Sequence, residues 1–304
     1  ELNRRLGTAF LVITHDMKLA ADLGGRTVVL YDGHVEEAGD TRALLDHPRH
    51  PYTRGLLQSA VGLNPVRDMW GIRPTTVSYT RQPHGCPFYG RCTQSLPDCA
   101  AHAPELETQP DGRLLACNRG GVLTLLECRG LRKSFGRQRV LDGIDLTLYS
   151  GEIVSLVGRS GAGKTTLLRI LMGLEVPDSG TLSGTDVRWS AVFQEDRLLP
   201  GLDAMENLRF VLGPDMDNDA AAAQLRALGL DPSPGQCVRS WSGGMRRRLA
   251  LARALLAPAD ALALDEPFTG VDAARAARIL ERVRALGVPV LLSSHEAEIV
   301  ALCD

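Results

Sequence analysis

One short segment constrains the fold of this chain more than any other. Residues 158–165 read G-R-S-G-A-G-K-T, fitting the pattern G-x-x-x-x-G-K-[ST], and they lie between the apolar run EIVSLV and the helical run TTLLRIL. Glycines let backbone N–H groups turn inward around phosphate oxygens, and a helix start adds a favourable dipole. The four specified positions coincide by chance only about once in tens of thousands of positions, which argues against a purely structural glycine turn.

The individual positions of this segment have distinct expected roles. Lys164 is expected to reach the β and γ phosphates of a nucleotide, and the Thr165 hydroxyl to ligate Mg²⁺. The remaining residues expected to line the phosphates are Gly158, Ser160, Gly161, Gly163 and Thr166. The segment therefore predicts a site for a magnesium nucleotide.

Such a site needs carboxylates, and the run ALALDEP supplies two of them at its end. Adjacent acids after a strand are more often turn or helix-cap residues when they stand alone. The phosphate-binding segment at a suitable distance reverses that expectation. Asp265 is expected to hold the Mg²⁺ shell, and Glu266 to orient and polarise the attacking water.

The run WSGGMRRRLALARALL, which begins at Trp241 shortly before the acidic strand, resembles the signature motif of ABC ATPases. Ser242, Gly243 and Gly244 open a predicted helix, so their backbone donors can face an anion. The resemblance implies an α/β P-loop ATPase fold: a RecA-like parallel sheet, an antiparallel β subdomain and a helical signature subdomain. It also implies ATP and Mg²⁺ as cofactors and a dimer, because the signature of one subunit faces the γ-phosphate held by the other.

Four weaker positions follow the same family pattern. Phe135 resembles the aromatic residue that stacks on adenine, and Gln194 resembles the glutamine that contacts Mg²⁺ and the transmembrane subunit. His295 resembles the histidine that contacts the γ-phosphate, and residues 270–272 the loop that couples two sites. Taken alone, a Phe is usually core, a Gln usually surface and a His usually a satisfied polar residue. Their order relative to the stronger motifs makes them candidates.

One sequence unit occurs twice in the chain. The two copies are AFLVITHDMKLAADL, starting at Ala9, and PVLLSSHEAEIVALC, starting at Pro289. In each, an apolar run that predicts a strand is followed by a hydroxyl residue, a histidine, an acid and a run that predicts a helix. After the first copy, TVVLYDGHVEEAG predicts a hairpin that turns at Asp32-Gly33. His15 takes the position of the γ-phosphate histidine in that copy. The chain is therefore expected to be a segment of a longer protein.

Three parts are predicted along the chain. Residues 1–45 are read as the C-terminal remnant of a first ABC ATPase domain, and residues 121–304 as a second, nearly complete one. Residues 46–120 contain frequent proline, clustered cysteine and little periodicity, which indicate a loop-rich extension. Runs such as HPRHPYTRGLLQS resemble the C-terminal extension of dipeptide, oligopeptide and nickel importer ATPases. The resemblances together imply a fusion of two ATPase domains.

Four thiols gather in the extension, at Cys86, Cys92, Cys99 and Cys117. Four thiolates can bind either zinc or an iron–sulfur cluster. The close C-x₂-C pairs usual at zinc sites are absent, and the resemblance to the importer extension implies a [4Fe-4S] cluster. Free buried thiols are the remaining alternative.

Charge and hydropathy limit the possible partners. The chain has 34 basic and 36 acidic residues and a net charge of -2, so no strong field favours nucleic acid or an anionic membrane. No apolar run approaches the roughly 18 to 20 residues that cross a bilayer, and the first residues lack the pattern of a signal peptide. These patterns predict a location in the cytoplasm, and the resemblance to importer ATPases implies the cytoplasmic face of the plasma membrane.

The resemblance implies an importer motor that works with transmembrane permease subunits and an extracytoplasmic substrate-binding protein. The first half suggests peptides or nickel as cargo. FQEDRLLP and SGGM instead resemble ATPases of nitrate, sulfonate and taurine importers. A non-transport ABC ATPase that remodels ribosomes or DNA is a further alternative, although the long basic linkers or coiled-coil insertions of such proteins are absent between the motifs.

Overall fold

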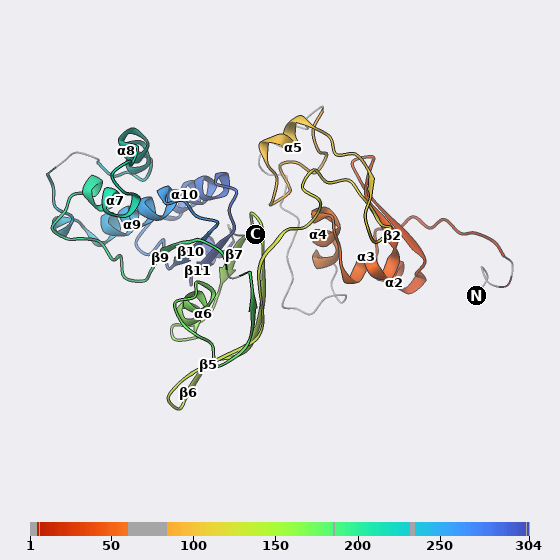
Figure 1. Ribbon diagram of the computed structural model, residues 1–304, viewed down its shortest axis with the longest axis horizontal. Coiled ribbons are helices and arrows are strands. Elements are labelled where there is room, and N and C mark those ends of the chain that lie inside the picture. The colour runs from red at the N-terminus through yellow and green to blue at the C-terminus, as the bar shows by residue number, and fades with distance from the viewer. Residues whose placement is uncertain are drawn as a thin grey trace. The chain divides into compact units, whose positions relative to one another are not determined.

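The computed structural model describes residues 5, 7–59, 84–184, 186–231, 235–301 and 303. The chain forms two compact units, Glu1–Val122 and Leu123–Asp304, and Figure 1 shows both. Within the described ranges, no helix has both the length and the apolar character needed to cross a membrane.

The first unit contains a four-stranded antiparallel sheet with the strand order β1-β2-β4-β3. The strands are β1 (Arg26–Tyr31), β2 (His34–Asp40), β3 (Glu107–Thr108) and β4 (Leu114–Leu115). The predicted hairpin between β1 and β2 is confirmed: Asp32 and Gly33 adopt φ angles of 47° and 81°. Two successive positive φ angles match the tight turn that fits the twist of paired strands.

Four described helices accompany this sheet: α2 (Met17–Leu23), α3 (Thr41–Asp46), α4 (Pro51–Ser59) and α5 (Pro97–Ala101). Asp16 and Asp40 cap the first two by accepting hydrogen bonds from backbone N–H groups of the first turn. These caps satisfy donors that have no partner inside a helix. They explain why both helices begin directly after an aspartate.

The strand predicted within residues 9–14 is not formed in this structure. Leu11 and Ile13 are each 93% exposed, and Phe10 and Val12 are at least half exposed. The second copy of the same pattern forms the fully buried strand β11 (Val290–Ser293) between two parallel neighbours. Within the described part of the first unit, no strand pairs with residues 9–14, and an isolated strand cannot satisfy its backbone groups.

The second unit is built on a four-stranded parallel sheet with the order β7-β11-β10-β9. The other three strands are β7 (Ile153–Leu156), β9 (Trp189–Val192) and β10 (Ala261–Asp265). Every residue of β10 and β11 is buried. Strands covered on both faces read as continuous apolar runs, which is the pattern of ALALD and VLLS.

A second, antiparallel sheet in this unit has the order β6-β5-β8. It consists of β5 (Thr124–Phe135), β6 (Gln138–Tyr149) and β8 (Ser179–Ser183). A parallel core with an antiparallel β subdomain is the predicted fold class, which is confirmed. The helix α6 (Lys164–Leu171) packs with both sheets through Leu167, Leu168 and Leu171.

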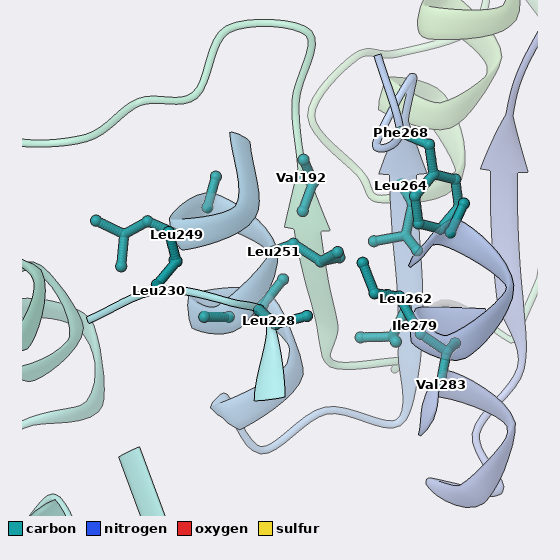
Figure 2. Packing of buried hydrophobic residues seen from close by; sticks show 14 of the residues in the cluster. Val192, Leu228, Leu230, Leu249, Leu251, Leu262, Leu264, Phe268, Ile279 and Val283 are labelled. Carbon is teal, nitrogen blue, oxygen red and sulfur yellow. The ribbon is translucent and has the colours of Figure 1, made fainter. Parts of the chain in front are cut away.

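The remaining helices are α7 (Ala204–Leu212), α8 (Asn218–Ala227), the 3₁₀ helix η2 (Val238–Ser240), α9 (Gly243–Leu256), α10 (Ala273–Ala285) and α11 (Ala297–Val300). Figure 2 shows Leu251 of α9 and Ile279 of α10 packing toward Leu262 and Leu264 of β10. Burial of such side chains contributes about 1.5 to 3 kcal/mol each. The helix α9 is thus fixed to the strand that ends at Asp265.

Candidate active site

All four parallel strands end beside a predicted site residue. β7 leads into the phosphate-binding loop, β10 ends at Asp265, β11 is followed by His295, and β9 is followed by Gln194. Carboxyl ends of parallel strands lie at one edge of a sheet, where open α/β folds bind their ligands. Strand order therefore gathers residues that lie far apart in the sequence.

The phosphate-binding loop has backbone geometry that requires glycine. Gly163, which caps α6, has φ 93°, and a Cβ atom there would lie 2.8 Å from Cδ2 of Leu141. Gly161 also has a positive φ of 79°. The Lys164 ammonium donates to the carbonyl oxygens of Gly158 and Arg159 at 2.7 and 3.2 Å. The predicted phosphate ligand thus lies against its own loop.

A hydroxyl–carboxylate–hydroxyl chain crosses the sheet edge. The Thr165 hydroxyl donates to Asp265 Oδ2 at 2.6 Å, and the Ser293 hydroxyl donates to Asp265 Oδ1 at 2.5 Å. Asp265 is only 4% exposed, so both bonds stabilise a carboxylate removed from water. Hard oxygen ligands of this kind suit Mg²⁺. Thr165 and Asp265 therefore fit the predicted metal site.

Glu266 contacts the predicted γ-phosphate histidine. Its Oε2 lies 2.9 Å from His295 Nδ1, and its backbone N–H donates to the Ser293 hydroxyl at 2.9 Å. Glu266 has a backbone φ of 52°, which is unfavourable for any residue other than glycine. Strain of this kind persists only where the surrounding structure imposes it, and it is common at functional sites.

Comparison with known proteins decides the family. Residues 141–269 match the ABC transporter family, and residues 36–99 match the oligopeptide/dipeptide transporter C-terminal region. The aliphatic sulfonates import ATP-binding protein SsuB of Rhodopseudomonas palustris is 45% identical over 195 residues, which cover 59% of this chain and 68% of that protein. This chain belongs to the ABC transporter ATP-binding proteins.

Two further comparisons agree with the ABC assignment. The Nod factor export ATP-binding protein I of Ralstonia nicotianae is 39% identical over 207 residues, 60% of this chain and 64% of that protein. A dimeric bacterial ABC transporter cassette of known structure aligns with a TM-score of 0.53 at 23% identity, over 59% of this chain and 91% of the cassette. The fold is that of an ABC ATPase, an enzyme that couples ATP hydrolysis to transport.

Other predicted positions of the ABC unit lie around this centre. Gln194 is exposed after β9, and Phe135 is half exposed at the end of β5, with the Lys133 ammonium 5.2 Å from its ring centre. Ser242 caps α9 by accepting from the Met245 N–H at 3.3 Å. None of the hydrogen bonds described for this unit joins residues 242–244 to the phosphate-binding loop.

Two residues with several contacts at the site were not predicted from the sequence. Ser293 links Asp265 to the Glu266 backbone, and Arg247 of α9 contacts the segments of both Gln194 and Asp265. The only sequence signal for Ser293 was the hydroxyl residue that closes an apolar run. For Arg247 the sequence held no such signal, because a basic residue on a helix is usually exposed to solvent.

The four thiols of the first unit do not support the expected iron–sulfur cluster. The Cys86 N–H donates to the Cys99 carbonyl at 2.7 Å, so the segment of Cys86 contacts α5. Burial raises the pKa of Cys86 to about 11 and that of Cys92 to about 12, because the charged thiolate is poorly solvated there. Over the described residues, which include all four cysteines, no three His, Cys, Asp or Glu side chains are placed to hold a metal ion. Spacing along the chain did not fix the distances between sulfurs.

Proposed function

We propose that the second unit binds MgATP at the edge formed by β7, β11, β10 and β9, and hydrolyses it to power an importer. The supporting observation is the chain of contacts that joins Thr165, Asp265, Ser293, Glu266 and His295. It places one carboxylate beside the hydroxyl of the phosphate-binding loop and the other beside a histidine. Such a division suits one acid for the metal and one for water.

Each residue then has a defined role in hydrolysis. The backbone N–H groups of residues 158–163 and the Lys164 ammonium hold the phosphates, and Thr165 and Asp265 hold Mg²⁺, with Gln194 as a further contact. Bound Mg²⁺ neutralises charge on the phosphate oxygens. Glu266 orients a water molecule and accepts its proton, while His295 fixes Glu266 and contacts the γ-phosphate. Catalysis consists of positioning and charge stabilisation, without a covalent intermediate.

The test of this site is the substitution Glu266→Gln. It keeps the size of the side chain and removes the base, so the turnover number is expected to fall about 100-fold or more while MgATP still binds. Binding is measured by titration calorimetry and turnover by phosphate release. Retention of wild-type turnover would remove Glu266 from its proposed role.

The site is proposed to be completed by a second ABC ATPase domain. The N–H groups of residues 242–244 begin α9, a helix of 14 residues whose dipole favours an anion at this end. In the dimer they are proposed to face the γ-phosphate held by the partner. MgATP would then close the two subunits and hydrolysis would release them. The solved cassette with the same fold is itself a dimer.

For the cargo, we favour a sulfonate-type organic anion over peptides or nickel. The support comes from the ABC unit, because its relatives in Rhodopseudomonas palustris and Nocardia farcinica, both 45% identical, are aliphatic sulfonates import proteins. The oligopeptide/dipeptide match covers residues 36–99, outside the catalytic unit. The proposed partners are transmembrane permeases and an extracytoplasmic substrate-binding protein, with the ATPase at the cytoplasmic face.

Uptake measurements in a strain lacking the protein distinguish these cargoes. Loss of uptake of a labelled alkanesulfonate, restored by the wild-type gene but not by Glu266→Gln, is the expected result. Loss of dipeptide or nickel uptake with normal sulfonate uptake would favour the other cargo. Co-purification with nucleic acid instead of permeases would favour the remodelling alternative.

We also propose that the first unit ends a separate ABC domain, fused to the second. The support is the apolar segment of residues 9–14, which has the pattern of the buried strand β11 but is exposed. An ABC sheet attached to the first unit would supply its parallel neighbours. Amide hydrogen exchange tests this: the amides of Leu11 and Ile13 should be protected in the intact protein and exchange freely in residues 1–304 alone. Equal exchange in both would argue against it.

A further inference from the structure

The Arg247 guanidinium lies at the meeting point of three segments of the catalytic unit. Arg247 is the fifth residue of α9, it is only 5% exposed, and its donors reach the segment after β9 and the segment after β10. A buried charge is costly unless its hydrogen bonds are satisfied. The hydrogen bonds of the Arg247 guanidinium must therefore offset the cost of its burial.

Toward the glutamine segment, Nη1 of Arg247 donates to the carbonyl oxygens of Phe193 and Gln194 and pairs with Asp196 Oδ1 at 3.2 Å. The bond to the Gln194 carbonyl is 3.4 Å long. These acceptors occupy three of the four residues from 193 to 196. Arg247 thus fixes the backbone on both sides of the Gln194 side chain.

Toward the acids, Nη2 of Arg247 donates to the Asp265 carbonyl and, at 2.8 Å, to the Glu266 carbonyl. Nε donates to the same Glu266 carbonyl at 3.2 Å. Glu266 is the residue with the unfavourable positive φ. Two donors on its carbonyl oxygen therefore hold its backbone in the conformation that aims its side chain at His295.

We infer that Arg247 is a positioning residue for ATP hydrolysis, which holds Gln194 and Glu266 in one fixed relation through their backbone carbonyls. The planar guanidinium spreads its donors in a rigid fork, so one side chain bridges the two segments. An ammonium group has three donors on a single atom and cannot span both. The inference rests on the proposed roles of Gln194 and Glu266.

The neighbouring Arg253 offers a matched comparison. It lies on the same helix and donates to the carbonyl oxygens of Arg197 and Asp196 at 2.7 and 3.0 Å. Its described hydrogen bonds reach neither Asp265 nor Glu266. It therefore holds part of the glutamine segment without linking that segment to the acids. Arg226 of α8 is exposed and serves as a control for the loss of one charge.

The experiment compares Arg247→Lys, Arg247→Gln, Arg253→Gln and Arg226→Gln in the full chain. Both Arg247 variants should lower kcat about 10-fold or more, because displacement of catalytic groups by about 1 Å can cost up to about 100-fold. Nucleotide affinity measured without Mg²⁺ should stay within about twofold, since none of the described hydrogen bonds of Arg247 reaches the phosphate-binding loop. Arg253→Gln should lower kcat less, and Arg226→Gln should leave it unchanged.

A second readout separates positioning from general stability. Because Gln194 is a proposed Mg²⁺ contact, the Mg²⁺ concentration for half-maximal activity should rise in both Arg247 variants and stay constant in Arg226→Gln. Wild-type kcat and Mg²⁺ dependence in folded Arg247→Lys would overturn the inference. So would a loss of thermal stability with normal kcat in the protein that remains folded.

Misfolding of the Arg247 variants and failure of the proposed site itself are distinguished by further variants. If the Arg247 variants do not fold, Asp196→Asn removes the anionic partner and decides: a lower kcat and a raised Mg²⁺ requirement support the inference, and normal values overturn it. If Glu266→Gln is active, the proposed site itself fails. If Glu266→Gln is inactive while Arg247→Lys is fully active, only the role of Arg247 fails.

Discussion

The Thr165 hydroxyl donates to Asp265 Oδ2 at 2.6 Å, although 100 residues separate the two in the sequence. Thr165 lies in the first turn of α6 beside the phosphate-binding loop, and Asp265 ends the buried strand β10. The bond thus joins the two strongest motifs of the sequence, the phosphate-binding loop and the acidic strand end, at one place in the structure.

The substitution Asp265→Ala tests that pairing. It removes the only carboxylate that contacts Thr165 in the described structure, so affinity for ATP in the presence of Mg²⁺ should fall about 10- to 100-fold, the usual scale for a weakened metal site. Calorimetric titrations with and without Mg²⁺ measure this. Without Mg²⁺, wild type and variant should bind ATP alike, and an unchanged effect of Mg²⁺ would contradict the assignment.

Ser293→Ala is predicted to slow hydrolysis without abolishing nucleotide binding. The Ser293 hydroxyl donates to Asp265 Oδ1 and accepts from the Glu266 N–H. Its loss leaves a buried carboxylate oxygen without its donor, while the Glu266 N–H keeps the Ser293 carbonyl at 3.2 Å. Stability should fall by about 1 to 3 kcal/mol. Urea denaturation and steady-state kinetics check both effects. Ser190, on β9, is equally a buried strand serine, and Ser190→Ala is the control for kcat.

Gly163→Ala should destabilise the second unit more than Gly173→Ala. Both glycines have positive φ, 93° and 72°, so alanine is strained at either position. Only at Gly163 would the new methyl carbon also meet Leu141 at 2.8 Å; around Gly173 there is open space. We expect about 1 kcal/mol for Gly173→Ala and at least about 2 kcal/mol for Gly163→Ala. Equal losses in thermal denaturation would show that the contact relaxes without cost.

The buried pair Glu36 and His50 should make the stability of the first unit depend on pH. Glu36 Oε2 lies 3.1 Å from His50 Nε2 without forming a hydrogen bond, and both side chains are nearly inaccessible to water. His50 Nδ1 accepts from the Tyr52 N–H, so the ring is neutral. Burial raises the pKa of Glu36 from 4.5 to about 7 and lowers that of His50 from 6.5 to about 3.

The signs of these two shifts are opposite. Glu36 stabilises the fold below pH 4.5, and its contribution is lost as pH rises to about 7; His50 destabilises it as pH falls from 6.5 toward 3. Glu36→Gln should therefore gain about 2 to 3 kcal/mol relative to wild type on going from pH 4.5 to pH 8. Hydrogen exchange of β2 amides at both pH values measures it. A constant difference would show that Glu36 titrates normally.

The sequence predicted those parts of the fold and of the site that depend on residues adjacent in the chain. The loop that ends at Thr165, the acids at Asp265 and the turn at Asp32 depend on local backbone geometry, and the structure has each of these local features. Whether Leu11 is buried depends on neighbouring strands, which periodicity does not reveal. Arg247 was missed for a related reason, since its acceptors are backbone carbonyls brought together only by the fold.

The strand order β7-β11-β10 has a mechanical consequence for the histidine. β11 lies between the strand of the phosphate-binding loop and the strand of the acids, and it carries Ser293 near its carboxyl end. A slip by one residue would turn Ser293 to the opposite face and draw His295 away from Glu266 in the same movement. Such a slip would require unzipping hydrogen-bonded ladders on both sides, so the histidine and the acid should keep their spacing even when surface loops open.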